Sequence, residues 1–338
     1  MNPEKTSDTA LRSDMLEKEP FDFAKWWDRV GILVVLLALV ALMAIIAPNF
    51  ARVDNFLNIA RAISVNAILA AGLTLVILTA GIDLSVGSIV AVSGVVSVLA
   101  AMAGIPAPVA VIAGMAAGAL CGLVNGALTA YLALAPFIVT LGTMTFLRGL
   151  AYTMTAGQPI VASDLNFKAL GNGYLAGVPV PVIVMLVVYV AVWFLLERTR
   201  YGRHVYAVGG NAEAAQLAGV RVKRVVTSVY VIAGACAGLA GVIFAARVIS
   251  AQPTAGTGYE LDAIAAVVLG GTSLAGGRGR IVGTLIGSVI LGVLSTGLIL
   301  MNVPFFTQLL IKGIVIIVAV AIDSLKQRQF IFSRIFKR

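Results

Sequence analysis

The stretch LSVGSIVAVSGVVSVLAAMAGIPAPVAVIAGMAAGALCGLVNGALTAYLALAPFIVTLGTMTFL, residues 84–147, contains no Asp, Glu, Lys or Arg. Residues 169–196 and 281–311 are equally free of charged side chains. A membrane-spanning helix needs about 20 consecutive, mostly apolar residues, so each stretch is long enough for at least one span. Over all 338 residues only 12% are charged, whereas about 25% is usual in a soluble domain. The sequence therefore predicts an all-α, polytopic membrane protein.

Apolar segments bounded by charges, prolines and glycine-rich breaks predict about ten transmembrane helices. These segments are residues 31–47, 63–80, 86–103, 107–131, 137–155, 178–196, 225–246, 263–275, 281–301 and 304–322. The expected organisation is an N-terminal tail (1–29), one transmembrane domain (30–323) and a C-terminal tail (324–338). The longest loop of the transmembrane domain is 198–224.

Lys and Arg are distributed unevenly over the two sides that ten spans would define. Eighteen of the 24 fall on the side of both termini, including six in the loop 198–224. Only Arg52, Arg61, Lys168 and Arg247 fall on the opposite side. Because cytoplasmic loops carry an excess of Lys and Arg, both termini and this loop are predicted to be cytoplasmic. This placement explains the net charge of +9 without a nucleic acid partner.

A faint internal repeat appears when the chain is aligned with itself at an offset of 196 residues. Asn66-Ala-Ile then aligns with Asp262-Ala-Ile, and Gly81 with Gly277. Duplicated halves are common in transporters, but an apolar composition also produces such matches by chance, so both interpretations stay open. Small residues four positions apart, as in Gly114 and Gly118, let helices approach closely in lipid and predict a tight bundle.

The sequence contains no arrangement typical of catalysis, nucleotide binding or metal binding. Its single histidine, His204, lies in the basic loop and is expected at the surface. Cys121 and Cys236 each lie in an apolar stretch and are expected to be buried thiols. No phosphate-binding Gly-x-x-x-x-Gly-Lys-Ser/Thr loop occurs. We expect no catalytic residue, metal or cofactor in this chain.

The loop 198–224 contains the segment GGNAEAAQLAG at 209–219. Asn211 suits the N-cap of a helix, Glu213 falls in the first turn, and Gly219 suits the left-handed position that ends a helix. These signals predict a two-turn helix outside the membrane, whose Ala214 and Ala215 give it a small, smooth surface. Such a helix could seat in a groove of another protein or merely join two spans, and the local sequence favours neither.

Asp83 lies in a glycine-bounded break, residues 79–88, between two apolar runs. Charges at membrane depth are costly, and a helix break there must line a cavity or be buried in protein. Arg278 and Arg280, in the corresponding break of the repeat, are the expected partners of Asp83 in a cytoplasmic latch. The alternative is an ordinary solvated turn.

Two basic residues, Arg148 and Lys312, fall inside predicted spans. Each could line a pathway, extend to the membrane surface or pair with a backbone carbonyl; the last two are favoured for Lys312.

Three segments together resemble the permease subunits of monosaccharide ABC importers, in particular the ribose-type permeases. They are residues 72–88, the pattern Glu-Ala-Ala-x-x-x-Gly at 213–219, and residues 250–277. The resemblance extends over about residues 31–323. It implies a homodimeric pore in a bacterial inner membrane, surrounded by lipid, fed by a periplasmic sugar-binding protein and driven by a separate ATPase subunit.

In such importers the Glu-Ala-Ala…Gly loop is the coupling helix that docks in a cleft of the ATPase. Glu213, Ala214, Ala215 and Gly219 match this pattern, and Asn211 would cap the helix. The resemblance says less about the pathway. The candidate gate or pathway residues are Asp83, Ser85, Asn66, Thr74, Asn125, Thr140, Thr143, Arg148, Arg278 and Arg280, although Ser, Thr and Asn also bind helices to one another.

A second hypothesis from another class is an ion-coupled secondary transporter of a small polar solute. Asp83, Arg148 and Lys312 within the apolar segments motivate it, and so does the repeat. Its weakness is the scarcity of carboxylates within the predicted spans, since a proton relay needs several titratable groups and Asp83 is only one. A membrane-integral enzyme is disfavoured because no nucleophile, base and orienting group converge in the sequence.

Overall fold

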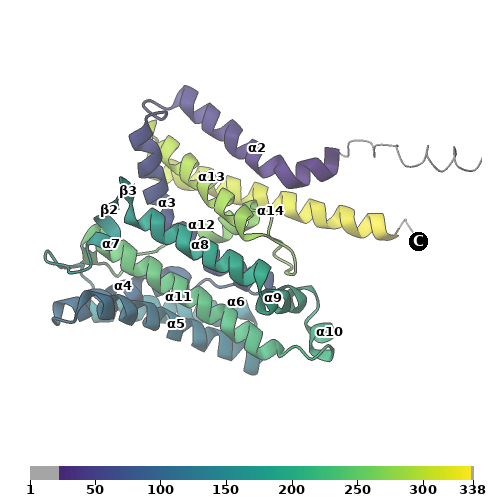
Figure 1. Ribbon diagram of the computed structural model, residues 1–338, viewed down its shortest axis with the longest axis horizontal. Helices are drawn as coiled ribbons and strands as arrows, with labels where there is room; N and C mark the ends of the chain where they lie inside the picture. The colour runs from purple at the N-terminus through teal and green to yellow at the C-terminus, as the bar shows by residue number, and fades with distance from the viewer. Residues whose placement is uncertain (1–22, 336–338) are drawn as a thin grey trace, which may run out of the picture.

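The structure of the protein is a computed structural model that describes residues 23–335, with side chains described for 30–318, 320 and 321. Within that range the chain is predominantly helical (Figure 1). The first 22 residues and the last three lie outside the described residues, and with them most of the predicted N-terminal tail. The prediction of a polytopic, helical membrane protein is confirmed.

Nine long helices form the body of the described chain. They are α2 (Phe23–Ile46), α3 (Val53–Leu78), α4 (Val86–Met102), α5 (Ala107–Tyr131), α6 (Pro136–Met154), α8 (Val180–Arg198), α11 (Val222–Val248), α13 (Ile281–Leu300) and α14 (Phe305–Ile335). Proline in the first turn begins α5, α6 and α8, where its missing N–H costs no helical hydrogen bond.

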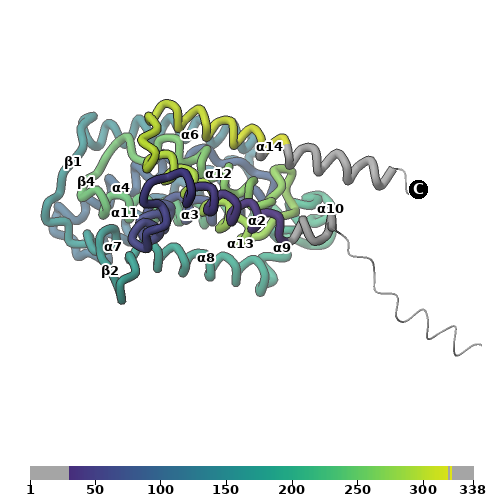
Figure 2. Tube along the Cα trace, turned by 90° about the horizontal axis from the view of Figure 1, so that it is seen from above, coloured from purple at the N-terminus to yellow at the C-terminus, as the bar shows by residue number. Residues whose placement is uncertain are grey.

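Short elements lie at the two ends of this bundle. At one end are α7 (Ala169–Asn172) and two small antiparallel ladders, β1 (Ile160–Val161) with β4 (Ser250–Ala251) and β2 (Tyr174–Leu175) with β3 (Val178–Pro179). At the other end are α9 (Arg200–Gly210) and α10 (Ala212–Leu217), as Figures 1 and 2 show. The predicted loop 198–224 is therefore largely helical.

The number of spans differs from the predicted ten. Six described helices, α3, α5, α6, α8, α11 and α13, are long and apolar enough to cross a membrane, and α2, α4 and α14 contain shorter apolar runs. The remaining segment, predicted at 263–275, is not a continuous span. Its helix, α12 (Tyr259–Leu269), has 11 residues, which at 1.5 Å per residue is roughly half of a 30 Å hydrocarbon core. Glycines at 270 and 271 end it, the second with φ +82°.

Helices α3 and α11 form the centre of the bundle. From Ser64 to Leu78 nearly every residue of α3 is buried. Helix α11 packs against α3, α4 and α5. By contrast, most residues of α5, α6 and α8 are exposed or only partly buried, with large apolar side chains such as Ile112, Leu120 and Val187 on their outer faces. Such outer faces are what a lipid-embedded bundle presents to acyl chains.

Glycines set the spacing between α5 and α11. The buried face of α5 consists of Ala110, Gly114, Gly118, Gly122, Asn125 and Gly126. A Cβ atom at Gly118 would overlap the carbonyl of Gly234, and one at Gly122 would overlap the carbonyl of Tyr230. The close approach predicted from small residues four positions apart is confirmed here.

Two helices, α4 and α12, begin after non-helical segments, residues 79–85 and 249–258. Each segment contains a non-glycine residue in the left-handed region, Ala80 (φ 60°) in the first and Ile249 (φ 52°) in the second. The starts of the two helices meet: a Cβ atom at Gly87 would overlap the Gly256 carbonyl and the Glu260 carboxylate. Both breaks therefore lead into one buried region of the bundle.

Candidate functional site

Helix α10 stands at the end of the bundle with most of its surface exposed. Asn211 caps it, because its Oδ1 accepts a hydrogen bond from the Ala214 amide at 2.9 Å. Gly219 follows it with φ +84°. The predicted short helix, its N-cap and its left-handed terminator are thus confirmed as local structure. Docking of α10 on another protein stays a prediction.

The exposed face of α10 includes a residue that sequence reasoning missed. Ala215 packs inward at 6% exposure, whereas Leu217 is 91% exposed and Ala214 is also exposed. A large apolar side chain so fully exposed outside the apolar body suggests a contact surface. Helical periodicity places Ala215 and Leu217 on opposite faces of the helix, so the exposure of Leu217 could have been predicted from the sequence.

Helix α9 connects α10 to the bundle. Thr199 caps it, accepting a hydrogen bond from the Gly202 amide at 3.2 Å. Near its other end, Gly209 lies so close to the Leu78 carbonyl that a Cβ atom would overlap it. The same Leu78 carbonyl accepts a hydrogen bond from the Gly277 amide at 2.9 Å. The end of α9 therefore touches both the end of α3 and the loop before α13.

A tyrosine adds a second contact between α9 and that loop. The Tyr206 hydroxyl donates a hydrogen bond to the Gly279 carbonyl at 3.0 Å. Burial raises the pKa of Tyr206 above its usual value; Glu197 raises it further, and Arg280 opposes the shift. The hydroxyl therefore keeps its proton at neutral pH and remains a donor.

Asp83 is fully buried in the first break. Its Oδ1 accepts hydrogen bonds from the Ser85 amide at 2.9 Å and the Ser85 hydroxyl at 2.6 Å. Asn125 of α5 donates through Nδ2 to the Ser85 hydroxyl at 2.8 Å. All three side chains have 0% exposure, which rules out the solvated-turn interpretation. Within the described part of the chain, the other carboxylate oxygen, Oδ2, has no hydrogen-bond partner, and neither has Oδ1 of Asn125.

Two further helices hold the backbone of this break. The Ile82 carbonyl accepts hydrogen bonds from the Thr140 hydroxyl of α6 at 3.2 Å and the Tyr230 hydroxyl of α11 at 3.3 Å. Helices α5, α6 and α11 thus all bond to the segment around Asp83. The expectation that a break at membrane depth is buried in protein is confirmed.

The predicted latch between Asp83 and an arginine is wrong. The described contacts of the Asp83 carboxylate are with Ser85, and no described residue bonds to its Oδ2. Arg278 and Arg280 are exposed residues of the loop before α13. The carboxylate is buried in protein, whereas the two guanidinium groups lie at the surface. Aligning the two breaks in sequence could not reveal this difference in burial.

Arg148 of α6 holds the second break. Its Nη1 donates to the carbonyls of Pro253 at 2.6 Å and Ala255 at 2.8 Å. These carbonyls belong to the non-helical segment before α12, so the guanidinium satisfies acceptors that no helix satisfies. Of the roles considered for Arg148, carbonyl pairing is the one found.

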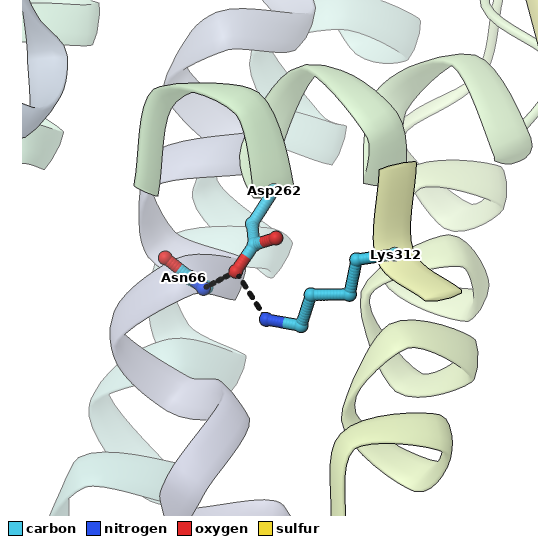
Figure 3. Close-up of polar contacts among 3 residues, drawn as sticks. All are labelled: Asn66, Asp262 and Lys312. Carbon is cyan, nitrogen blue, oxygen red and sulfur yellow. Dashed lines mark hydrogen bonds and ion pairs between the residues drawn. The ribbon is translucent and has the colours of Figure 1, made fainter. Parts of the chain in front are cut away.

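The preferred interpretation of Lys312 is wrong, because its partner is a carboxylate. Its Nζ lies 2.9 Å from Oδ2 of Asp262, in the first turn of α12. Asn66 of α3 also donates to this oxygen, at 3.4 Å (Figure 3). Sequence reasoning missed Asp262 as a site residue, although a lysine inside a span calls for a carboxylate inside another. The contact joins two aligned residues of the repeat, but it does not test duplication, so the repeat stays a prediction.

The remaining candidate residues bind helices together or bond within one helix. The Thr74 hydroxyl bonds to that of Thr284 at 2.9 Å and joins α3 to α13. Thr143 bonds to the Val139 and Thr140 carbonyls of its own helix.

Cys236 is buried, as predicted, and Cys121 is partly buried; both are free thiols. His204 is exposed. Among the described residues, no group of three or more His, Cys, Asp and Glu side chains could hold a metal ion.

The family model of the permease component of branched-chain amino acid transport systems matches residues 55–320. This match includes the Asp83 break, α10 and Asp262. The chain belongs to this family of ABC permeases. The resemblance inferred from three sequence segments is thereby confirmed.

Named relatives of the permease match along most of their length. The ribose import permease protein of Escherichia coli strain K12 is 50% identical over 307 residues, which cover 89% of this chain and 95% of the relative. That of Bacillus subtilis strain 168 is 47% identical over 312 residues (92% and 97%). The D-allose transport system permease protein of E. coli strain K12 is 40% identical over 319 residues (94% and 98%). No solved structure matches the permease.

Proposed function

We propose that this permease forms the translocation pathway of an ATP-driven importer for a monosaccharide, with ribose as the first candidate. The observation that carries the proposal is the 50% identity, over 95% of its length, to a protein named a ribose import permease. Relatives named for allose, fructose and arabinose support a monosaccharide more broadly. The ion-coupled alternative is not favoured, because these relatives are components of import systems.

The proposed assembly contains two copies of the permease in a bacterial inner membrane. An ATPase subunit binds at α10 and a periplasmic sugar-binding protein at the opposite end. Figure 1 supports a common side for α10 and the C-terminal half of α14, which extend toward the same end of the bundle. With the basic excess of the loop 198–224, we place that end and both termini in the cytoplasm.

In the proposed mechanism, α10 transmits the motion of the ATPase. Leu217 and Ala214 supply its contact face, while Asn211, Glu213 and Gly219 fix the helix and its ends. The motion passes along α9 to Gly209, which lies against the Leu78 carbonyl, and through Leu78 to Gly277. Leu78 ends α3 directly before the Asp83 break. A shift of α9 therefore acts on the segment whose side chains bond to α5, α6 and α11.

Reconstitution tests this function. Liposomes that contain the permease, its ATPase and the sugar-binding protein should accumulate radiolabelled D-ribose only when ATP is present on the ATPase side. Uptake by the permease alone, or uptake driven by a pH gradient without nucleotide, would contradict the proposal and favour a secondary transporter.

A further inference from the structure

A cavity of about 210 Å³ lies among α3, α12, α13 and α14. Its polar lining includes Asn66, Tyr259, Asp262, Ser295, Thr296 and Lys312. None of its lining residues belongs to α9, α10 or the Asp83 break. The proposed coupling path therefore leaves this cavity without a role.

The cavity contains an ion pair that is not fully covered by protein. The side chains of Lys312 and Asp262 are 22% and 19% exposed. Removing two charges from water costs more than their mutual attraction returns unless further polar groups surround them. An ion pair among apolar helices that borders a polar cavity is therefore expected to serve a ligand or a pathway.

One acceptor in this cluster is unsatisfied. Asn66 donates through Nδ2 to Asp262, but its Oδ1 is buried and has no hydrogen-bond partner among the described residues. This oxygen is buried away from the cavity, so the group that Asn66 contributes is its Nδ2, which orients the Asp262 carboxylate.

The charge balance of the cluster selects the class of ligand. Lys312 and Asp262 neutralise each other, so neither an anion nor a cation gains net attraction. A neutral solute with several hydroxyl groups fits instead, because each hydroxyl donates and accepts. It would donate to Asp262 and accept from Lys312, while Ser295 and Thr296 on α13 can do both. The cavity volume of about 210 Å³ is many times the roughly 10–15 Å³ that one water needs in the same measure, so there is room for one small polyol.

We propose that this cavity is a monosaccharide subsite inside a single permease chain, with Asp262 and Lys312 as its hydrogen-bonding groups and Asn66 as the residue that positions Asp262. The sugar class rests on the function proposed above. The site would hold the sugar in transit, after its release from the binding protein.

Cysteine protection tests this subsite in the full-length permease. In a background with Cys121→Ala and Cys236→Ala, a single Ser295→Cys substitution places a thiol on the cavity wall. The protein is held in phosphatidylcholine nanodiscs, and the rate of labelling by a small methanethiosulfonate reagent is measured with and without D-ribose. Ser163→Cys, at an exposed loop position, is the control for general reactivity.

At a ribose concentration of ten times Kd, labelling of Ser295→Cys should be slowed about tenfold, while labelling of Ser163→Cys should not change. Adding Asn66→Leu, which removes the hydrogen bond that orients Asp262, should weaken the protection and leave the ion pair in place. The double change Asp262→Asn and Lys312→Gln should abolish the protection, without leaving one charge unpaired. Labelling that is indifferent to ribose up to its solubility limit would overturn the subsite.

Two further measurements distinguish sugar binding from lipid binding, and the subsite from the transport function. Phosphatidylglycerol in the nanodisc carries a polyol headgroup; if it slows labelling without sugar, the cavity binds lipid and the proposal is overturned. Uptake by the complete reconstituted system is measured in parallel. If ribose is taken up with ATP but does not slow the labelling of Ser295→Cys, the subsite proposal is overturned and the proposed transport function stands. If the complete system hydrolyses ATP in a coupled manner but takes up none of the monosaccharides tested, the proposed function is overturned instead.

Discussion

Asp83 illustrates what individual residues contribute to this molecule. Its position in a break between apolar runs predicts a costly group that needs burial or a partner. The structure confirms the burial, but the partner of the carboxylate is Ser85, to which Asn125 donates in turn, rather than an arginine. The sequence could not indicate this, because Asn125 lies 40 residues from Ser85 in the chain. The same holds for Asp262 and Lys312, which are 50 residues apart.

At Asp83, charge reversal and neutralisation should have opposite outcomes. Asp83→Lys should abolish transport, because it places an unpaired ammonium in a fully buried site, at a cost of several kcal/mol. Asp83→Asn keeps the Oδ1 acceptor for Ser85 and should retain most of the transport. ATP-driven sugar uptake per inserted permease measures both. Wild-type uptake by Asp83→Lys would show that the segment tolerates charge and has no gating role.

At the scale of elements, the sequence predicted helices better than the contacts between them. The bounds of α5 agree fully with prediction, and the caps of α10 were found from Asn211 and Gly219. By contrast, the apolar run 263–275 was predicted to be a span, but the structure has a short helix there followed by a turn. Hydropathy alone does not separate a spanning helix from a buried half-helix, since both consist of apolar residues. Helix α9 was missed because helices other than α10 were predicted from continuous apolar runs, and a helix with one apolar and one polar face does not form such a run.

The exposed face of α10 should decide coupling. Leu217→Ser and Ala214→Trp should each lower sugar uptake at least about tenfold, if docking loses 1.4 kcal/mol or more. The permease should still insert, because both side chains point away from the bundle. The measurements are ATP hydrolysis and uptake in the same liposomes. Gln216→Ala, at an exposed polar position of α10, is the matched control. An equal loss there, or none at Leu217, would contradict docking through this face.

The glycine contact between α5 and α11 should be intolerant of side chains. Gly122→Leu should destabilise the permease by about 1–3 kcal/mol or prevent its assembly, because a Cβ there overlaps the Tyr230 carbonyl. Gly149→Leu on α6, where a Cβ meets no described atom within 4 Å, should be tolerated. Thermal unfolding in detergent, followed by size-exclusion chromatography, compares the two. Similar midpoints for both variants would show that α5 and α11 are not packed in this way.

For the whole molecule, the distribution of Lys and Arg predicts an orientation, which the local motifs do not. The uneven placement of Lys and Arg predicts an orientation that places α10 in the cytoplasm, on the side where ATP is available. The internal repeat remains a prediction, because contact between Asn66 and Asp262 is compatible with duplication and with coincidence.

The orientation can be measured directly. A cysteine at Gln216 should react in intact cells only with a membrane-permeant thiol reagent, and one at Ser163 also with an impermeant reagent, in a background without the two native thiols. The reason is that the basic loop 198–224 is expected to stay on the cytoplasmic side. Labelling of both positions by the impermeant reagent in sealed cells would contradict the predicted topology.

The contact between α5 and α11 also limits which movements are open to the pair. Their backbones touch at Gly118, Gly122 and Gly234. Sliding one helix along the other by one residue, about 1.5 Å, would bring larger side chains into this contact. The two helices must travel together as one rigid body. We therefore expect alternating exposure of the sugar to the two compartments to involve hinge rotations in the segments 79–85 and 249–258, whose hydrogen bonds to neighbouring helices would have to change.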